Sequence, residues 1–221
     1  MNRKTNGVQT RNKKVLGLVQ VALFASLIII MAFTPFLGYI PLGITNATTI
    51  HIPVIIGAIL LGPKKGAVLG FVFGMTSLIK STISPTPTAF VFSPFYSLGE
   101  IHGGFQSLII CFVPRILIGV VPYYVYHFFS KITKKWKSSR TFSLGAAGVA
   151  GSLTNTILVM GMILIFFKDA YAAANEVAVQ AVYTLIAGTI AINGVPEAIV
   201  AAVIVAFVTK VLLKSKYFRG N

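Results

Sequence analysis

The chain has 221 residues, of which 56% are hydrophobic and only 10% are charged, and its mean hydropathy is +0.85. A soluble domain of this length needs roughly a quarter charged residues to cover its surface, so the composition excludes a soluble globular protein and indicates a membrane protein. The charge is one-sided, with 19 Lys plus Arg against 4 Asp plus Glu. Such an excess can indicate nucleic-acid binding, but the positions of the basic residues favour a topological cause.

Six apolar segments have a length suited to membrane-spanning helices, which need about 20 mainly apolar residues. They are residues 15–34, 45–62, 64–82, 105–129, 144–167 and 179–212. The last segment is long enough to tilt or to begin outside the bilayer. The sequence therefore predicts an all-α membrane protein with six transmembrane helices in one domain, residues 15–213, between basic tails at 1–14 and 214–221.

Most basic residues fall on one side of this predicted topology. Sixteen of the 19 lie in the two tails, in the turn after the second segment and in the loop after the fourth: Arg3, Lys4, Arg11, Lys13, Lys14, Lys64, Lys65, Lys131, Lys134, Lys135, Lys137, Arg140, Lys210, Lys214, Lys216 and Arg219. Basic residues collect on the cytoplasmic side of membrane proteins, so we expect both termini to be cytoplasmic. Short basic flanks rather than one basic face argue against nucleic acid as a partner.

Small residues recur along two of the predicted helices. Gly66, Gly70 and Gly74 stand at every fourth position of the third segment and would form a strip where another helix backbone approaches closely. The alternative is that glycine is simply common in membrane helices. In the first segment, Ala22 and Ser26 have the same spacing, which fits packing within the bundle and docking onto another membrane protein equally well.

The outer loop that joins the third and fourth segments has an unusual composition. Its sequence SPTPTAFVFSPFYSLGEIHGG, residues 84–104, contains three prolines that prevent a regular helix and aromatic residues that include Phe92 and Tyr96. This loop is too apolar to lie free in water, so we expect it to fold over the bundle and cap a small-molecule pocket. The alternative is that its aromatic residues form a belt at the membrane interface.

Several polar residues lie inside predicted spans, among them Arg115, Asn155, Asn193 and Glu197. Arg115 and Glu197 each follow a proline, and because a charge in hydrocarbon is costly, each should face the bundle interior or a wet cavity. They could pair with each other or with backbone carbonyls freed by the prolines, or Arg115 could receive an anionic group of a ligand, such as a carboxylate. Asn155 and Asn193 can either contact a ligand or join helices.

Further candidates lie at the outer ends of the second and third segments. His51 lies close to where the first outer loop descends, although a histidine there could equally cap a helix, and Lys80 could simply be solvated. The complete set of candidate ligand-binding residues is Asn46, Thr49, His51, Ser77, Lys80, Phe92, Tyr96, Arg115, Asn155, Asn193 and Glu197.

The sequence lacks the motifs of several enzyme classes. Its one aspartate, Asp169, and its scattered histidines offer no metal-ligand spacing, and there is neither a G-x-S-x-G elbow nor a phosphate-binding G-x-x-x-x-G-K-[ST] loop. We therefore expect no enzymatic activity, no cofactor and no metal. Transport against a gradient would then need an ATP-hydrolysing partner or an ion gradient. Coupling to a proton gradient would need a relay of titratable residues inside the spans, and Glu197 and Arg115 are the candidates for it. A purely structural subunit would need no pocket.

Three stretches carry a resemblance to a known family. They are IHIPVIIGAILLGPKKGAVLGFVFGMTSLIKSTISPTP at 50–87, PRILIG at 114–119 and NGVPEAIVAAVI at 193–204. With them, the chain resembles the substrate-binding S components of the energy-coupling factor (ECF) vitamin importers of bacteria and archaea. The resemblance implies a six-helix fold in the bacterial plasma membrane, in contact with lipid, whose outer loops close over a vitamin.

The same resemblance implies a partner. In the family, an Ala-x-x-x-Ala patch on the first helix contacts a transmembrane coupling subunit that carries two ATPases. That motif corresponds to Ala22 and Ser26 here, and the serine departs from it. The chain is then expected to bind without chemistry and to deliver its ligand by docking on the ATP-driven module.

The resemblance also bears on the ligand. The loop at 84–104 and the NGVPEA segment look most similar to pantothenate-type members, while riboflavin, folate and a cobalamin-related vitamin stay open as alternatives. PRILIG looks shared by several substrate branches, which favours a structural role for Arg115.

Overall fold

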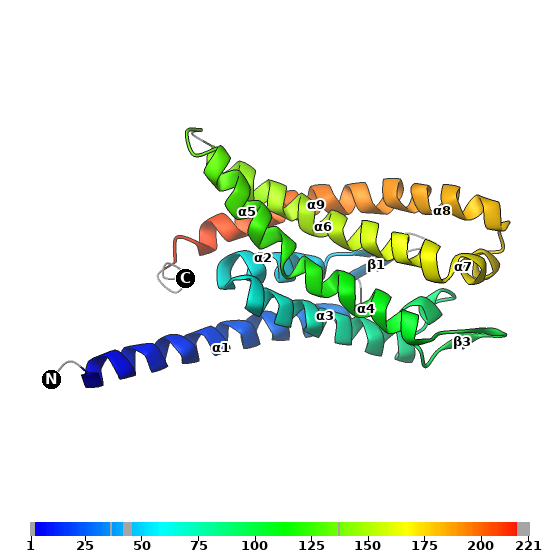
Figure 1. Cartoon of the computed structure of the whole chain (residues 1–221), viewed down its shortest axis with the longest axis horizontal. Helices are drawn as coiled ribbons and strands as arrows, with labels where there is room; N and C mark the ends of the chain where they lie inside the picture. Colours follow the sequence, from blue (N-terminus) through cyan, green and yellow to red (C-terminus); the bar gives the residue numbers. More distant parts are fainter. Residues whose placement is uncertain (1–2, 36, 42–45, 137, 216–221) are drawn as a thin grey trace.

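The computed structural model of the chain describes residues 3–35, 37–41, 46–136 and 138–215. Helices lie side by side along the long axis of the molecule (Figure 1). In the described ranges they are α1 (Arg3–Phe33), α2 (His51–Leu61), α3 (Pro63–Ile83), α4 (Phe105–Ile118), α5 (Val121–Ile132), α6 (Ser139–Phe166), α7 (Lys168–Ala174), α8 (Val182–Thr189) and α9 (Val195–Leu212). Short 3-10 turns occupy Ala89–Val91 and Val179–Ala181, and a π-helical turn occupies Ile190–Gly194.

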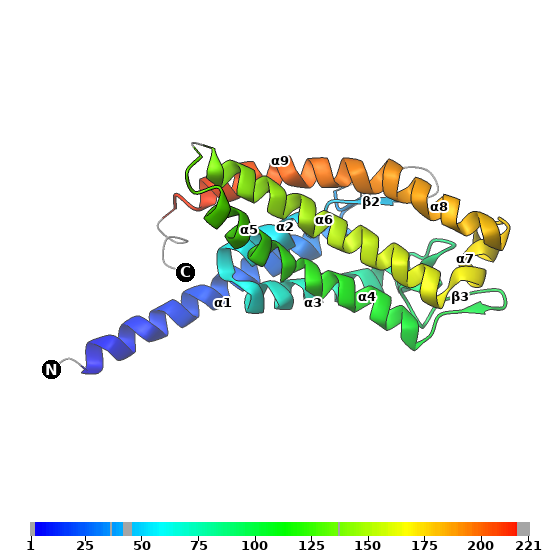
Figure 2. The same cartoon turned by 45° about the horizontal axis from the view of Figure 1, so that its top comes forward.

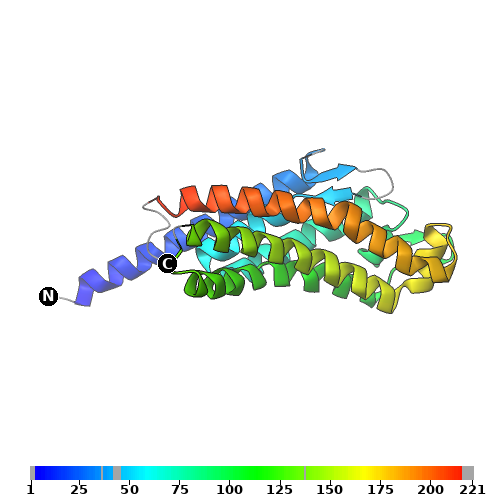
Figure 3. The same cartoon turned by 90° about the horizontal axis from the view of Figure 1, so that it is seen from above.

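Two small antiparallel hairpins accompany the helices. Strand β1 (Tyr39–Pro41) pairs with β2 (Asn46–Thr48) in the loop between α1 and α2. Strand β3 (Ser97–Leu98) pairs with β4 (Ile101–His102) in the loop between α3 and α4. The beginning of α1 and the end of α9 lie toward one end of the bundle, whereas β3 and α7 lie at the other (Figure 1). The β1–β2 hairpin lies beside the junction of α8 and α9 (Figures 2 and 3).

Five stretches of the described chain are long and apolar enough to cross a membrane: Lys14–Phe33, Pro63–Ile83, Phe105–Ile132, Ser139–Phe166 and Val179–Leu212. Their outward side chains are apolar, as shown by Leu18, Ile165 and Phe207, which are 71%, 75% and 72% exposed. Exposed apolar surface of this extent suits contact with lipid. The prediction of a helical multi-span membrane protein is confirmed, and five of the six predicted segments reach spanning length.

Helix α2 is the exception to this pattern. The sequence predicted a helix over residues 45–62, but β2 occupies Asn46–Thr48, and the helix has only 11 residues. At roughly 1.5 Å per residue it is about 16 Å long, well short of the hydrocarbon core of about 30 Å. All of its residues are buried. The predicted start was wrong, and α2 is an interior helix surrounded by its neighbours.

The predicted helix at 105–129 is also divided. It breaks into α4 and α5 at Gly119–Val120, and Pro122 stands in the first turn of α5, where its missing N–H leaves no bond unmade. Gly119 faces Gly66 of α3 so closely that a Cβ on either residue would collide with the other's carbonyl oxygen. The break thus lies where the backbones of α3 and α4 approach each other.

The glycine strip of α3 faces α4 along its length. A Cβ at Gly70 would collide with the carbonyl oxygen of Arg115, and a Cβ at Gly74 would lie 2.7 Å from Cδ1 of Phe112. Because nothing larger than hydrogen fits there, the two helices pack backbone against backbone. This contact fixes the depth at which Arg115 enters the bundle.

Helix α6 is the central element of the other half of the bundle. It runs between α4 and α5 on one side and α8 and α9 on the other (Figure 2). A Cβ at Gly148 would lie 2.8 Å from the carbonyl oxygen of Ala201 in α9, and a Cβ at Gly194 would lie 2.8 Å from Cγ2 of Thr156. Small residues on both helices therefore bring the π-helical turn against the middle of α6.

Candidate ligand-binding cavity

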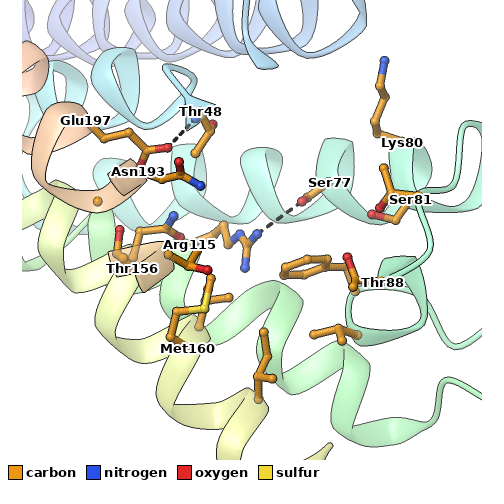
Figure 4. A pocket seen from close by; sticks show the side chains of 18 of the residues that line it. Thr48, Ser77, Lys80, Ser81, Thr88, Arg115, Thr156, Met160, Asn193 and Glu197 are labelled. Atoms are coloured by element: carbon orange, nitrogen blue, oxygen red, sulfur yellow. Dashed lines mark hydrogen bonds between the residues drawn. The ribbon is translucent and has the colours of Figure 1, made fainter. Parts of the chain in front are cut away.

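A cavity of about 400 Å³ lies inside the half of the bundle nearer α7 and the hairpins. Its walls come from α3, α4, α6, the α7 region, the π-helical turn and the beginning of α9, and two loops contribute Thr48 and Phe92. The cavity therefore lies beyond the N-terminal end of the short helix α2. Figure 4 shows how its polar side chains are arranged.

Arg115 of α4 supplies a buried cation to this cavity, with 6% of its surface exposed. Its Nη1 donates to the carbonyl oxygen of Ile110 over 2.8 Å, and its Nη2 donates to Oγ of Ser77 over 3.5 Å. The guanidinium carbon lies 4.8 Å from the ring centroid of Phe92 and 5.6 Å from that of Phe73. Aromatic faces attract a cation, so these contacts hold the guanidinium at the cavity wall.

The C-terminal part of α3 presents a polar stripe to the cavity. Ser77, Lys80 and Ser81 line it together with Ser84, which directly follows the helix, and the spacing of the first three places them on one helical face. In Figure 4 the side chains of Ser77 and Ser81 point toward the space beside Arg115, whereas the ammonium of Lys80 points away from it. The hydroxyl groups can therefore reach a ligand in the position shown, while Lys80 stands at the rim.

A second group of polar residues lines the cavity from α6, the π-helical turn and α9. Asn193 and Glu197 line it from the π-helical turn and α9, and Asn155 and Thr156 line it from α6. Oε1 of Glu197 accepts a hydrogen bond from the backbone N–H of Thr48 over 2.6 Å. Carboxamides supply both donors and acceptors, and a carboxylate supplies acceptors. This side of the cavity suits a ligand end that carries hydroxyl or amide groups.

Apolar side chains complete the wall. Val159, Met160 and Ile163 of α6 line the cavity together with Val91 of the 3-10 turn and Tyr171 of α7. Burial raises the pKa of the Tyr171 phenol above its usual range, so its hydroxyl stays protonated. An apolar wall with a few converging polar groups is the usual composition of a small-molecule site.

Seven of the eleven candidate residues line this cavity: Ser77, Lys80, Phe92, Arg115, Asn155, Asn193 and Glu197. Three others with described side chains lie elsewhere. Thr49 donates through Oγ1 to the carbonyl oxygen of Leu37 over 2.7 Å. His51 is buried in the first turn of α2, and Tyr96 packs against the apolar cluster around Phe90 and Phe167. The backbone of Asn46 forms part of β2, but its side chain is outside the described part of the structure.

The sequence argument missed several cavity residues. Thr48, Ser81, Thr156 and Thr189 all line the cavity. Hydroxyl side chains in helices often bond to a carbonyl of the preceding turn, as Thr189 does with Leu185 over 2.9 Å. Such residues cost little in a membrane and give only a weak signal in a sequence. The spacing of Ser77 and Ser81 on one face of α3 was the available indication for Ser81.

Ala22 and Ser26 are both exposed on the outward side of α1, whereas Phe24 and Ile28 face the core. The pair therefore does not pack within the bundle, which was one of its two interpretations. A small, smooth strip on α1 is left open on the molecular surface.

Together, these features define a helical membrane protein with a cavity of small-molecule size whose lining includes a buried cation and a carboxylate. Residues 17–209 match the family described as "ECF transporter, substrate-specific component". The chain belongs to this family: it is the multi-pass, substrate-specific component of an ECF transporter, a transport protein of the cell membrane rather than an enzyme. Members of the family work with an ECF module.

Two curated relatives are similar over nearly their whole length. The "Pantothenic acid transporter PanT" of Lactococcus lactis subsp. cremoris is 35% identical over 208 residues, which cover 93% of this chain and 98% of the relative. The "Pantothenate transporter PanT" of Leuconostoc mesenteroides subsp. mesenteroides is 30% identical over 207 residues, which cover 91% of this chain and 94% of the relative.

Proposed function

We propose that this chain captures pantothenate at the outer face of the bacterial plasma membrane and delivers it through an ATP-driven coupling module. Both relatives described above are named as pantothenate transporters. The observation that carries the proposal is the position of Arg115, a buried cation at the wall of a cavity that is otherwise lined by apolar and uncharged polar side chains with Glu197 and Lys80. Pantothenate is an anion with a carboxylate at one end, an amide in the middle and two hydroxyl groups toward the other end.

The size of the cavity supports a small ligand. Sites for small molecules have volumes of roughly 300 to 1,000 Å³, and about 400 Å³ is near the lower limit. Riboflavin, folate and a cobalamin-related vitamin are the alternatives, and all of them are larger than pantothenate. Of the two described rings beside the cation, those of Phe73 and Phe92, that of Phe92 also lines the cavity, and a single ring there offers little of the stacking surface that an isoalloxazine or pterin ring would need.

The chemistry of the cavity supports one direction of binding. The planar guanidinium of Arg115 matches a carboxylate, and Ser77 and Ser81 lie on the same side of the space. Asn155, Asn193 and Glu197 would then face the amide and hydroxyl groups of the ligand. A ligand with one anionic end and one hydroxylated end satisfies both sides.

The membrane orientation follows from the basic residues. The turn between α2 and α3 and the loop between α5 and α6 carry lysines, and both lie toward the end of the bundle where α1 begins and α9 ends (Figure 1). The positive-inside bias supports a cytoplasmic location for that end and for both termini. The cavity and the β3–β4 hairpin would then lie at the extracellular side.

We propose that delivery uses an ATP-hydrolysing partner rather than an ion gradient, because the chain belongs to a family of ECF transporter components and its sequence has no ATP-binding loop of its own. We propose that Ala22 and Ser26 on the exposed face of α1 dock onto the coupling subunit, which carries two ATPases. The remaining exposed apolar side chains of the bundle would contact lipid.

Two measurements test this function. Purified full-length chain should bind radiolabelled pantothenate, and an excess of unlabelled pantothenate should displace it while riboflavin, folate and cobalamin should not. Vesicles that contain the chain together with an ECF module should take up pantothenate only when ATP is present on the side of the membrane that carries the ATPases. Displacement by another vitamin, or concentrative uptake by the chain alone, would contradict the proposal.

A further inference from the structure

A hydrogen bond connects the cavity wall to the loop between α1 and α2. The backbone N–H of Thr48 donates to Oε1 of Glu197 over 2.6 Å, although the two residues are 149 positions apart in the chain. Thr48 ends strand β2, and both residues line the cavity. Figure 4 shows the bond at the edge of the space, with Asn193 beside it. The carboxylate of Glu197 therefore contacts both the cavity and the β1–β2 hairpin.

Hydrogen bonds around Thr48 connect the end of β2 to the chain just before β1. Thr48 lies opposite Tyr39 in the antiparallel register. The next residue, Thr49, donates its backbone N–H to the carbonyl oxygen of Gly38 over 3.0 Å and its hydroxyl to that of Leu37 over 2.7 Å. A group that holds the N–H of Thr48 thus holds the whole β1–β2 hairpin over this side of the cavity.

Glu197 has capacity for a second partner. A carboxylate offers about four lone-pair positions on two oxygens, and the bond from Thr48 occupies one of them. Asn193 precedes it by four residues, which places both on one helical face. The π-helical turn just before α9 is a feature often found at functional sites, and β2 lies against it.

We propose that Glu197 is the specificity residue for the uncharged end of the ligand: its carboxylate accepts a hydrogen bond from a ligand hydroxyl and, through Thr48, holds the β1–β2 hairpin closed. This inference rests on the proposed function, in which Arg115 receives the carboxylate at the other end. A ligand that fills the cavity excludes water, and hydrogen bonds are stronger in the drier surroundings. Occupation of the cavity by a hydroxylated ligand therefore strengthens the attachment of the hairpin.

The ligand half of the proposal is tested with two ligands and three proteins. Equilibrium binding of pantothenate and of its deoxy analogue, which lacks the terminal hydroxyl, is measured on full-length wild type, Glu197→Ala and Glu197→Gln. Wild type should prefer pantothenate by about tenfold, the usual order for one buried hydrogen bond. Glu197→Ala should bind both ligands equally, and Glu197→Gln, which keeps an acceptor oxygen, should retain more of the preference. An equal preference in wild type and Glu197→Ala would overturn the assignment.

The hairpin half has its own readout. Amide hydrogen exchange of the peptide that contains Thr48 should be faster in Glu197→Ala than in wild type, and pantothenate should slow the exchange only in wild type. A matched pair of variants removes the bond from the other side: Thr48→Pro lacks the N–H, whereas Thr48→Ala keeps it. Thr48→Pro should raise the dissociation rate of pantothenate several-fold more than Thr48→Ala, and it should add nothing in the Glu197→Ala background. Additive effects would show that the two residues act independently, and they would contradict the proposal that the bond between Thr48 and Glu197 holds the hairpin.

The outcomes separate this inference from the proposed function. If wild type fails to bind pantothenate, the proposed function fails and the ligand half falls with it, while exchange at Thr48 in the ligand-free protein still decides the hairpin half. If wild type binds pantothenate but the deoxy preference and the exchange rates do not depend on Glu197, only the inference fails. Thermal melts of every variant identify a loss of folding, and Glu197→Gln provides the comparison if Glu197→Ala does not fold.

Discussion

The guanidinium of Arg115 lies against the ring of Phe92, with 4.8 Å between the guanidinium carbon and the ring centroid. Arg115 belongs to α4, whereas Phe92 belongs to the proline-rich loop between α3 and α4. The contact places a loop side chain over a cation inside the helix bundle. The loop is therefore part of the cavity wall, and its position depends on the residue that the ligand carboxylate is proposed to meet.

We predict that Arg115→Lys lowers the affinity for pantothenate by about tenfold to a hundredfold. Lysine keeps the positive charge but loses the planar fork that binds both carboxylate oxygens, and a hydrogen bond to a charged group contributes about 1.5 to 3 kcal/mol. Binding of radiolabelled pantothenate to the purified protein measures the change. An unchanged affinity would show that Arg115 has a structural role, the alternative that the shared PRILIG motif favoured.

A second variant tests the aromatic contact. Phe92→Leu keeps an apolar side chain over Arg115 but removes the attractive ring face, which contributes about 0.5 to 2 kcal/mol to a contact of this kind. We expect a smaller loss of affinity than for Arg115→Lys, with little change in the melting temperature. A loss equal to that of Arg115→Lys would mean that Phe92 touches the ligand itself.

Glycine substitutions test the packing of α3 on α4. A Cβ at Gly70 would collide with the carbonyl oxygen of Arg115, whereas a Cβ at Gly161 of α6 would meet nothing within 4 Å. Gly70→Ala should destabilise the protein by about 1 to 3 kcal/mol, the usual cost of overpacking. Gly161→Ala is the matched control, and it should leave stability unchanged or raise it slightly. Equal melting temperatures of the two variants in detergent would show that α3 and α4 can move apart freely.

Labelling of single cysteines tests the membrane orientation. Cys111, the one native cysteine, is buried and donates through Sγ to the carbonyl oxygen of Gly74 over 3.3 Å, so its background reaction should be low. A membrane-impermeant maleimide should label Ser97→Cys in intact cells, and it should label Lys134→Cys only after permeabilisation. Both positions are exposed. The reverse pattern would place the termini outside and contradict the proposed orientation.

Bulky substitutions test the docking face of α1. Ala22→Trp should leave pantothenate binding to the isolated chain intact but should strongly reduce ATP-dependent uptake with the ECF module, because a large side chain keeps two helix backbones apart. Ile157→Trp on α6, at an exposed position away from α1, provides the control and should reduce uptake far less. If both variants transport at the wild-type rate, docking does not use this part of α1.

The physical cost of polar groups in a membrane explains which residues could be predicted. Arg115, Asn155, Asn193 and Glu197 stood out in the sequence because a polar side chain inside an apolar segment needs a partner, and the structure gathers all four around one cavity. Thr156 lies in the same wall but bonds to the carbonyl oxygen of Ser152. A hydroxyl that is satisfied within its own helix does not reveal where it points.

Boundaries and irregular turns were harder to predict than spans. Residues 45–50, TNATTI, carry no charge and directly precede the apolar run, and periodicity does not separate a short strand from the first turn of a helix. The division of α4 from α5 at Gly119 and the π-helical turn at Ile190–Gly194 depend on contacts with α3 and α6. Thr49 and His51 follow the cavity residue Thr48 closely in the sequence, yet neither lines the cavity. The direction in which a side chain leaves the backbone at the start of α2 could not be predicted from the sequence.

The shortness of α2 sets the capacity of the binding chamber. Thr48, three residues before α2 begins, lines the chamber. An additional turn at the N-terminal end of α2 would extend that helix by about 5.4 Å and would take up residues that now form β2. The position at which this one helix begins therefore determines how large a molecule the protein can hold.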